Sequence, residues 1–300
     1  MPDAPLPLPA SPAPLAATHS RLWLPRPALS ACVRGLLVRD TRGVALSEAQ
    51  RYNHFPASPF CSLCWWPEGE ALGLLPGHPA LPSSPRMAMP GRALFFGPVT
   101  GPLISHNPGP VRSLLLMMAP DAVHALTGLP VAGWVDRHAA IGEALGPEWQ
   151  ALSDAVLAEP DESRWMPLID DFLAPRWAAV RPRAPLLPHR YRDWAQALAL
   201  RAATSAPGRS LRQVERRVRQ WAGQPLRELQ GLVRLEEAFF TAVAAQAQGP
   251  VAWADVAADT GFADQSHLCR ATRRFTGFSP QALARRIAED ETFWPYRVWI

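Results

Sequence analysis

The spacing of hydrophobic residues changes along the chain, and the changes divide the sequence into regions. Between residues 21 and 118, short apolar runs alternate with Pro- and Gly-rich turns, a pattern typical of strands. From 119 to 180, apolar residues recur at three- and four-residue steps, which predicts helices. A proline-rich stretch at 180–190 indicates a boundary, and the sequence beyond it is almost entirely helical in pattern. The sequence therefore predicts an α+β protein with a β-rich N-terminal part and an all-α C-terminal part.

The helical C-terminal part contains an internal repeat. A shift of 54 residues places 210–229 over 264–283 without a gap, so that Arg216 meets Arg270 and Gly223 meets Gly277. Solenoids usually need three or more repeats to bury a continuous core. Two copies of one small unit are therefore predicted, rather than a repeat array.

Each copy has the sequence signals of two helices joined by a tight turn. In the second copy, Gly261 suits the positive φ that ends a helix, and Asp264 suits the cap of the next helix. In the first copy, Ser210 and Gln213 match a capping box. Pro207 stands where Gly261 would fall, so the opening helix of this copy is expected to end early.

The second helix of each copy is amphipathic. We expect an apolar side that is buried, formed by Leu211, Val214, Val218, Trp221, Leu268 and Phe275. We expect a polar, basic side formed by Arg212, Arg216, Arg219, Ser266, Arg270 and Arg273. In a major groove, Arg can bond guanine O6 and N7, and further arginines can meet phosphates.

The segment between the copies, 226–249, has one amphipathic pattern of more than 20 residues. As a helix it would span about 30 Å, close to the roughly 34 Å of one turn of DNA. Gly231 would weaken this helix by about 1 kcal/mol relative to Ala. Such a helix could place two reading helices in successive major grooves.

The stretches SLRQVERRVRQWAGQPLREL and GFADQSHLCRATRRFTGFSP resemble the two helix-turn-helix units of AraC/XylS-type transcriptional regulators, over about residues 188–287. The resemblance implies that the second helix of each unit, 210–221 and 264–276, enters the major groove. It also implies that residues 119–175 are similar to the linker helices of some members. The DNA-binding residues expected from it are Arg212, Gln213, Arg216, Arg219, Gln265, Ser266, His267, Arg270 and Arg273.

Charge is distributed unevenly along the chain. Residues 1–180 carry 12 Arg against 15 Asp and Glu, a net charge of −3, whereas 181–300 carry 18 Arg against 11 acids, a net charge of +7. All basic residues other than His are Arg. The C-terminal part is therefore the candidate for a polyanionic partner.

Cys61 and Cys64 form a CxxC motif, which in other settings holds zinc or carries out redox chemistry. Residues three apart on a strand point to opposite faces, and the sequence lacks a second CxxC or paired His. We therefore expect buried thiols, with no metal, no cofactor and no catalytic residues. The alternative is an Ada-type DNA-alkylation-repair enzyme with a fused DNA-binding module, which bound zinc would favour.

The expected domain organisation has five parts: a disordered Pro-rich tail (1–20), a β-rich effector-binding or dimerisation domain (21–118), a helical linker (119–180), the double helix-turn-helix domain (188–287) and a C-terminal tail (288–300). No long apolar run or secretory signal is present, so a cytoplasmic bacterial protein with no membrane contact and reduced cysteines is expected. Its expected partners are operator or promoter DNA, RNA polymerase, a small-molecule effector and a second copy of the chain.

Overall fold

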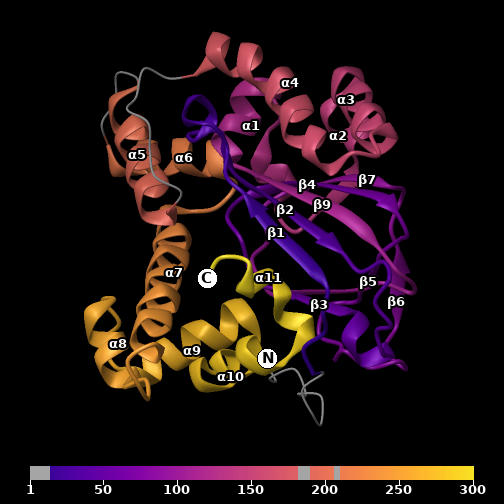
Figure 1. Cartoon of the computed structure of the whole chain (residues 1–300). Coiled ribbons are helices and arrows are strands. Elements are labelled where there is room, and N and C mark those ends of the chain that lie inside the picture. Colours follow the sequence, from indigo (N-terminus) through magenta and orange to yellow (C-terminus); the bar gives the residue numbers. More distant parts are fainter. Residues whose placement is uncertain (1–13, 182–189, 206–209) are drawn as a thin grey trace.

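The computed structural model describes residues 14–181, 190–205 and 210–300. The N-terminal part is built on two antiparallel sheets, and the C-terminal part is helical (Figure 1). The larger sheet has the order β1 (His19–Trp23), β2 (Val33–Asp40), β9 (Arg112–Met118), β4 (Cys61–Glu68), β7 (Ala93–Phe96), β10 (His138–Ala140). The smaller sheet has the order β3 (Tyr52–Phe55), β8 (Leu103–His106), β5 (Leu72–Leu74), β6 (Arg86–Ala88).

Strand β4 shows how the larger sheet separates two environments. Cys61, Leu63 and Trp65 are completely buried in the main hydrophobic core. The alternate residues Ser62 and Cys64 line a cavity on the other face of the sheet. This alternation confirms that the two cysteines of the CxxC motif point to opposite faces.

Four helices cover the core face of the larger sheet (Figure 1). They are α1 (Pro120–Thr127), α2 (Ile141–Leu145), α3 (Pro147–Ala158) and α4 (Trp165–Val180). Trp149 and Trp165 lie in the same core cluster as Trp65, and β10 extends the larger sheet by pairing with β7 at its edge. The segment predicted as a helical linker is thus part of the N-terminal domain, because its large apolar faces need the sheet for burial.

The C-terminal domain contains a long helix between two shorter groups of helices (Figure 1). Its helices are α5 (Tyr191–Thr204), α6 (Leu211–Ala222), α7 (Leu226–Gln246), α8 (Trp253–Asp259), α9 (Gln265–Thr276) and α10 (Pro280–Glu289). The proline-rich boundary predicted at 180–190 lies almost wholly outside the described residues. None of the described helices is long and apolar enough to cross a membrane.

Both ends of the chain depart from the predicted tails. Residues 1–13 lie outside the described residues, but His19 and Ser20 already belong to β1, so the predicted tail is too long. The predicted C-terminal tail is folded: it forms a 3-10 turn, η5 (Glu291–Phe293), and the short helix α11 (Trp294–Arg297). Its aromatic side chains are buried against β3, a long-range contact that local sequence patterns do not reveal.

Candidate nucleic-acid interface

The second helix-turn-helix unit consists of α8, a tight turn and α9. Gly261 has a φ of +74°, and the Phe262 N–H donates to the carbonyl of Ala257 at 2.9 Å, which closes the end of α8. Asp264 Oδ1 accepts a hydrogen bond from the His267 N–H at 2.6 Å and so caps α9. The turn and cap predicted from the sequence are confirmed.

The first unit consists of α5 and α6. Ser210 Oγ accepts a hydrogen bond from the Gln213 N–H at 3.4 Å. This is one of the two reciprocal bonds of the predicted capping box, the one made by the Ser side chain. Helix α5 ends at Thr204. Pro207, on which the prediction of an early helix end rests, lies outside the described residues.

The second helices of the two units, α6 and α9, keep the register of the sequence repeat. Helices α6 and α9 each have 12 residues, and their bounds differ by the same 54 residues as the repeat. Both end at a glycine of positive φ, Gly223 at +77° and Gly277 at +84°. The internal repeat of the sequence is therefore an internal repeat of structure.

One polar face of each of the helices α6 and α9 is exposed. At 3.6 residues per turn, Arg212, Arg216 and Arg219 fall within about 60° of one another around α6. Ser266, Arg270 and Arg273 occupy the equivalent arc on α9. These six residues and Gln265 are exposed, whereas Gln213 and His267 are half-buried. No acidic group of the described residues forms an ion pair with the five arginines named above, which leaves two basic faces of like geometry.

Leu211 and His267 depart from the expected pattern. Leu211 was predicted on the buried side of α6 but is 88% exposed, because the first turn of the helix extends beyond the packed core. The His267 ring packs edge-on against Phe262, with ring centroids 5.2 Å apart, and its Nδ1 accepts from the Ala263 N–H at 3.4 Å. His267 therefore helps to hold the turn as well as standing at the edge of the basic face.

The helical domain is attached to the N-terminal domain through each of its units. In the first unit, Arg201 forms an ion pair with Asp121 of α1 at 2.8 Å, and Trp194 Nε1 donates to the same carboxylate at 2.8 Å. In the second unit, the carbonyl of Phe275 in the last turn of α9 accepts a hydrogen bond from the Ala57 N–H at 2.8 Å. These contacts could not be predicted from the sequence, since their partners lie far apart in the chain.

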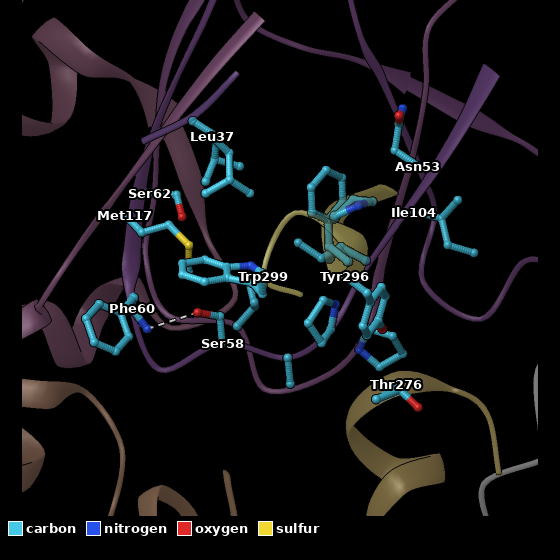
Figure 2. Close-up of a pocket in the computed structure, with 18 of the residues that line it drawn as sticks. Leu37, Asn53, Ser58, Phe60, Ser62, Ile104, Met117, Thr276, Tyr296 and Trp299 are labelled. Carbon is cyan, nitrogen blue, oxygen red and sulfur yellow. Dashed lines mark hydrogen bonds between the residues drawn. The ribbon is translucent and has the colours of Figure 1, made fainter. Parts of the chain in front are cut away.

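A cavity of about 700 Å³ lies between the sheets of the N-terminal domain and the helices of the C-terminal domain. Figure 2 shows Leu37, Met117 and Ile104 of the sheets on its walls, with Tyr296 and Trp299 of the C-terminal segment reaching into it. Most of the lining is apolar. A cavity of this size and character can hold a small molecule.

Two buried arginines, Arg34 and Arg39, lie in the cavity wall, and each forms an ion pair with a buried glutamate. Arg34 pairs with Glu236 of α7 at 2.5 Å, and its guanidinium lies over the rings of Tyr191 and Trp299. Among the described residues, Nε and Nη1 of Arg34 and Nε of Arg39 have no hydrogen-bond partner. These N–H groups are spare donors beside an apolar space.

The cysteines are placed as packing residues. Cys32, Cys61 and Cys64 are buried, and burial raises the pKa of each thiol above its ordinary value, which keeps it protonated. Within the described part of the chain, no group of three or more His, Cys, Asp and Glu side chains could hold a metal ion. The geometry offers the CxxC motif no further ligands.

A comparison with protein families finds a match in the helical C-terminal domain. Residues 204–286 match the family model described as a helix-turn-helix domain. Among curated proteins, none matches the chain.

The chain is also similar to solved structures of ToxT from Vibrio cholerae. An apo ToxT variant of strain SCE256 is 11% identical, over 83% of this chain and 95% of that chain, with a TM-score of 0.36. ToxT of strain O395 is 9% identical, over 90% and 97%, with a TM-score of 0.34. A wild-type ToxT structure from strain SCE256, bound to an unsaturated fatty acid, is 10% identical over 79% and 94%, with a TM-score of 0.32.

The family match covers α6, α9 and the long helix α7 between them. Residues 204–286 therefore form a helix-turn-helix domain, the kind of unit that binds DNA.

Proposed function

We propose that the protein is a sequence-specific regulator that inserts α6 and α9 into successive major grooves of an operator. The single observation that carries the proposal is the pair of capped 12-residue helices, in one register, each with an exposed arginine face. Helix α7 has 21 residues, so it spans about 30 Å between the two units. That length is close to the roughly 34 Å between successive major grooves on one side of DNA.

The exposed residues divide by their position on each helix. N-terminal residues of a recognition helix contact base edges, so we assign base reading to Arg212, Gln213 and Arg216 on α6. On α9 the same role goes to Gln265, Ser266, His267 and Arg270. Arg219 and Arg273 lie a turn further on and are assigned to phosphates, which fix register without reading sequence.

The test is a titration of labelled duplex DNA with the purified protein at several salt concentrations. The duplex is the tightest binder that the wild-type protein selects from a random-sequence pool. Arg216→Ala and Arg270→Ala should each weaken binding by about 1–3 kcal/mol and relax the preferred base at one position. Arg219→Ala and Arg273→Ala should weaken binding to all sequences alike and lower the salt slope by about one.

Arg164→Ala is the control for net charge. Arg164 is exposed and lies in the N-terminal domain. Its substitution by Ala removes one positive charge, as each of the four substitutions on α6 and α9 does. The DNA affinity of Arg164→Ala should stay within about twofold of the wild type, because interactions between exposed charges more than about 10 Å apart are largely screened at 0.1 M salt. Binding that ignores salt, or that survives both base-reading substitutions, would refute the assignment.

We further propose that the cavity between the domains binds the effector, a small molecule with an apolar body and an anionic group. The apolar lining supports the body, and the spare N–H groups of Arg34 and Arg39 support the anion. A ligand without a hydrogen-bond acceptor would leave these buried donors unsatisfied, which is costly, and a charged acceptor forms the stronger bonds.

Two matched fluorescent probes test the ligand class. Anilinonaphthalene sulfonate is anionic, and N-phenyl-1-naphthylamine has the same aromatic frame without the charge. The anion should bind more tightly, and Ser62→Phe, which places a ring in the cavity, should weaken both probes. Equal binding of the two probes would contradict the anionic group, and unchanged binding to Ser62→Phe would contradict the site.

RNA polymerase contact and a homodimer stay predictions from the resemblance. The Ada-type alternative requires bound zinc, and the separation of Cys61 and Cys64 onto opposite faces of β4 argues against a shared ion there. Zinc analysis of the purified protein measures this directly. One tightly bound zinc per chain would favour the repair enzyme.

A further inference from the structure

The last eleven residues, Asp290–Ile300, form a segment that we call the C-terminal clasp. It follows α10 and lies beyond the helix-turn-helix match, which ends at residue 286. All residues from Asp290 to Tyr296 are buried. In Figure 1 the clasp lies between the helical domain and the sheets, with the chain terminus at the centre of the molecule.

The clasp binds the N-terminal domain through a buried carboxylate and an indole. Glu291 Oε1 accepts a hydrogen bond from Arg39 Nη2 of β2 at 2.6 Å and another from Thr18 Oγ1 at 2.6 Å. Trp294 Nε1 donates to Asn53 Oδ1 of β3 at 2.7 Å. These groups are sequestered from water, so each contact is costly to break without its partner.

Aromatic rings connect the clasp to the reading helix α9. Phe293 stacks on His54 of β3, with centroids 4.6 Å apart and the planes 9° from parallel. Phe278, directly after the glycine that ends α9, packs edge-on against both rings. The end of α9, the clasp and β3 therefore pack together as one unit. The hydrogen bond from the Ala57 N–H to the Phe275 carbonyl also joins α9 to the N-terminal domain.

The clasp restricts how the two reading helices can adjust to DNA. The first unit is fixed to α1 through Asp121, and the second is fixed to β3 through the clasp, so the N-terminal domain holds both. Binding two grooves requires one specific separation and orientation of α6 and α9. A domain attached at both ends reaches a different arrangement only by breaking one attachment, and that cost is subtracted from DNA affinity.

We propose that the clasp is an autoinhibitory contact, which holds α9 on the N-terminal domain in an arrangement that binds DNA less tightly than the released one. The proposal rests on the proposed DNA-binding function. Tyr296 and Trp299 of the clasp also line the cavity, so a ligand there acts on the same contact. By linkage, a ligand that favours the docked clasp must weaken DNA binding.

Three variants release the clasp to different degrees. Glu291→Gln removes the charge paired with Arg39, Trp294→Phe removes the indole donor but keeps an aromatic ring, and a chain ending at Glu289 removes the clasp entirely. Trp149→Phe is the matched control, because Trp149 is a buried tryptophan of α3 whose ring packs against Phe172 of α4. Circular dichroism verifies that each protein is folded.

Affinity for the duplex selected by the wild type is measured for every protein. Hydrogen exchange of the amides at 290–300 is measured for the wild type and for the variants that contain this segment. The point variants should exchange faster in this segment and bind DNA about fivefold to tenfold more tightly, tenfold being the factor that 1.4 kcal/mol gives. The truncated chain should bind at least as tightly as the point variants, and Trp149→Phe should match the wild type.

Unchanged or weaker DNA binding by folded proteins with a released or absent clasp would overturn the autoinhibitory role. Failure of the proposed function looks different, since then neither the wild type nor any variant selects a duplex or shows salt-dependent binding. The point variants keep the test decisive if the truncated chain does not fold.

Discussion

The buried histidine of β3 makes the stability of the protein depend on pH in a way that can be calculated. Burial lowers the pKa of His54 to about 4, from an ordinary 6.5; the negative charge of Asp290 opposes this shift to a smaller extent, and the positive charge of Arg286 adds to it. A folded-state pKa below the unfolded one means that the unfolded chain takes up a proton first as pH falls. Stability is therefore fully present above about pH 6.5 and is lost as pH falls toward 4.

The size of the effect follows from the two pKa values. At about pH 7.5 neither state is appreciably protonated at residue 54. At about pH 5 the unfolded state is protonated and the folded state is mostly not, which lowers the free energy of unfolding by about 2 kcal/mol. The total loss below pH 4 approaches about 3 kcal/mol. Because His54 stacks on Phe293, the side chain that causes this loss lies at the contact between β3 and the clasp.

The assay is urea denaturation from pH 7.5 to pH 5 for the wild type and for His54→Phe, which keeps an aromatic ring and removes the titration. Other titrating groups contribute equally to both proteins and cancel in the difference. The wild type should lose about 2 kcal/mol more than the variant across this range. Equal losses would show that His54 is not held neutral by burial, and the reasoning would fail.

Three further predictions concern local features. Gly223→Ala should destabilise the protein more than Gly261→Ala in thermal unfolding, because both have positive φ but only at Gly223 would the new Cβ lie 2.9 Å from Val135; equal losses would contradict this. Asp264→Ala should cost about 1 kcal/mol of stability through loss of the α9 cap, and Asp264→Ser should restore most of it. In thiol labelling of the native protein, half-buried Cys269 should react first, while the three buried cysteines should react only on unfolding; prompt labelling of Cys61 would contradict its place in the core.

The parts of the fold that the sequence predicted correctly are local. The Asp264 cap, the Gly261 turn and the register of α6 and α9 depend on residues a few positions apart, so their patterns survive in the one-dimensional sequence. The opposite placement of Cys61 and Cys64 followed from strand geometry alone. The exposure of Leu211 was missed because helical spacing gives a direction and does not say where the packed core ends.

The long-range contacts could not be predicted in the same way. Arg34 with Glu236 and Arg39 with Glu291 join residues more than 200 positions apart, and nothing near either partner indicates the other. The aromatic-rich ending FWPYRVWI was the one available signal, since so many large apolar side chains are seldom left in water. The assignment of 119–180 to a linker failed for a similar reason, because helical spacing does not say what a helix packs against.

Glu291 also joins the two ends of the chain, since its carboxylate accepts hydrogen bonds from the Ala16 N–H and the Thr18 hydroxyl. These partners are separated by 275 and 273 positions. During synthesis the N-terminal domain emerges first and can fold before the last residues are made. The contact of Arg39 on β2 with Glu291 can therefore form only after residues 290–300 have been made, later than the contacts of Asp121 with Trp194 and Arg201. Chains that stop before residue 290 would contain both sheets and helices α5–α10 but would lack this contact.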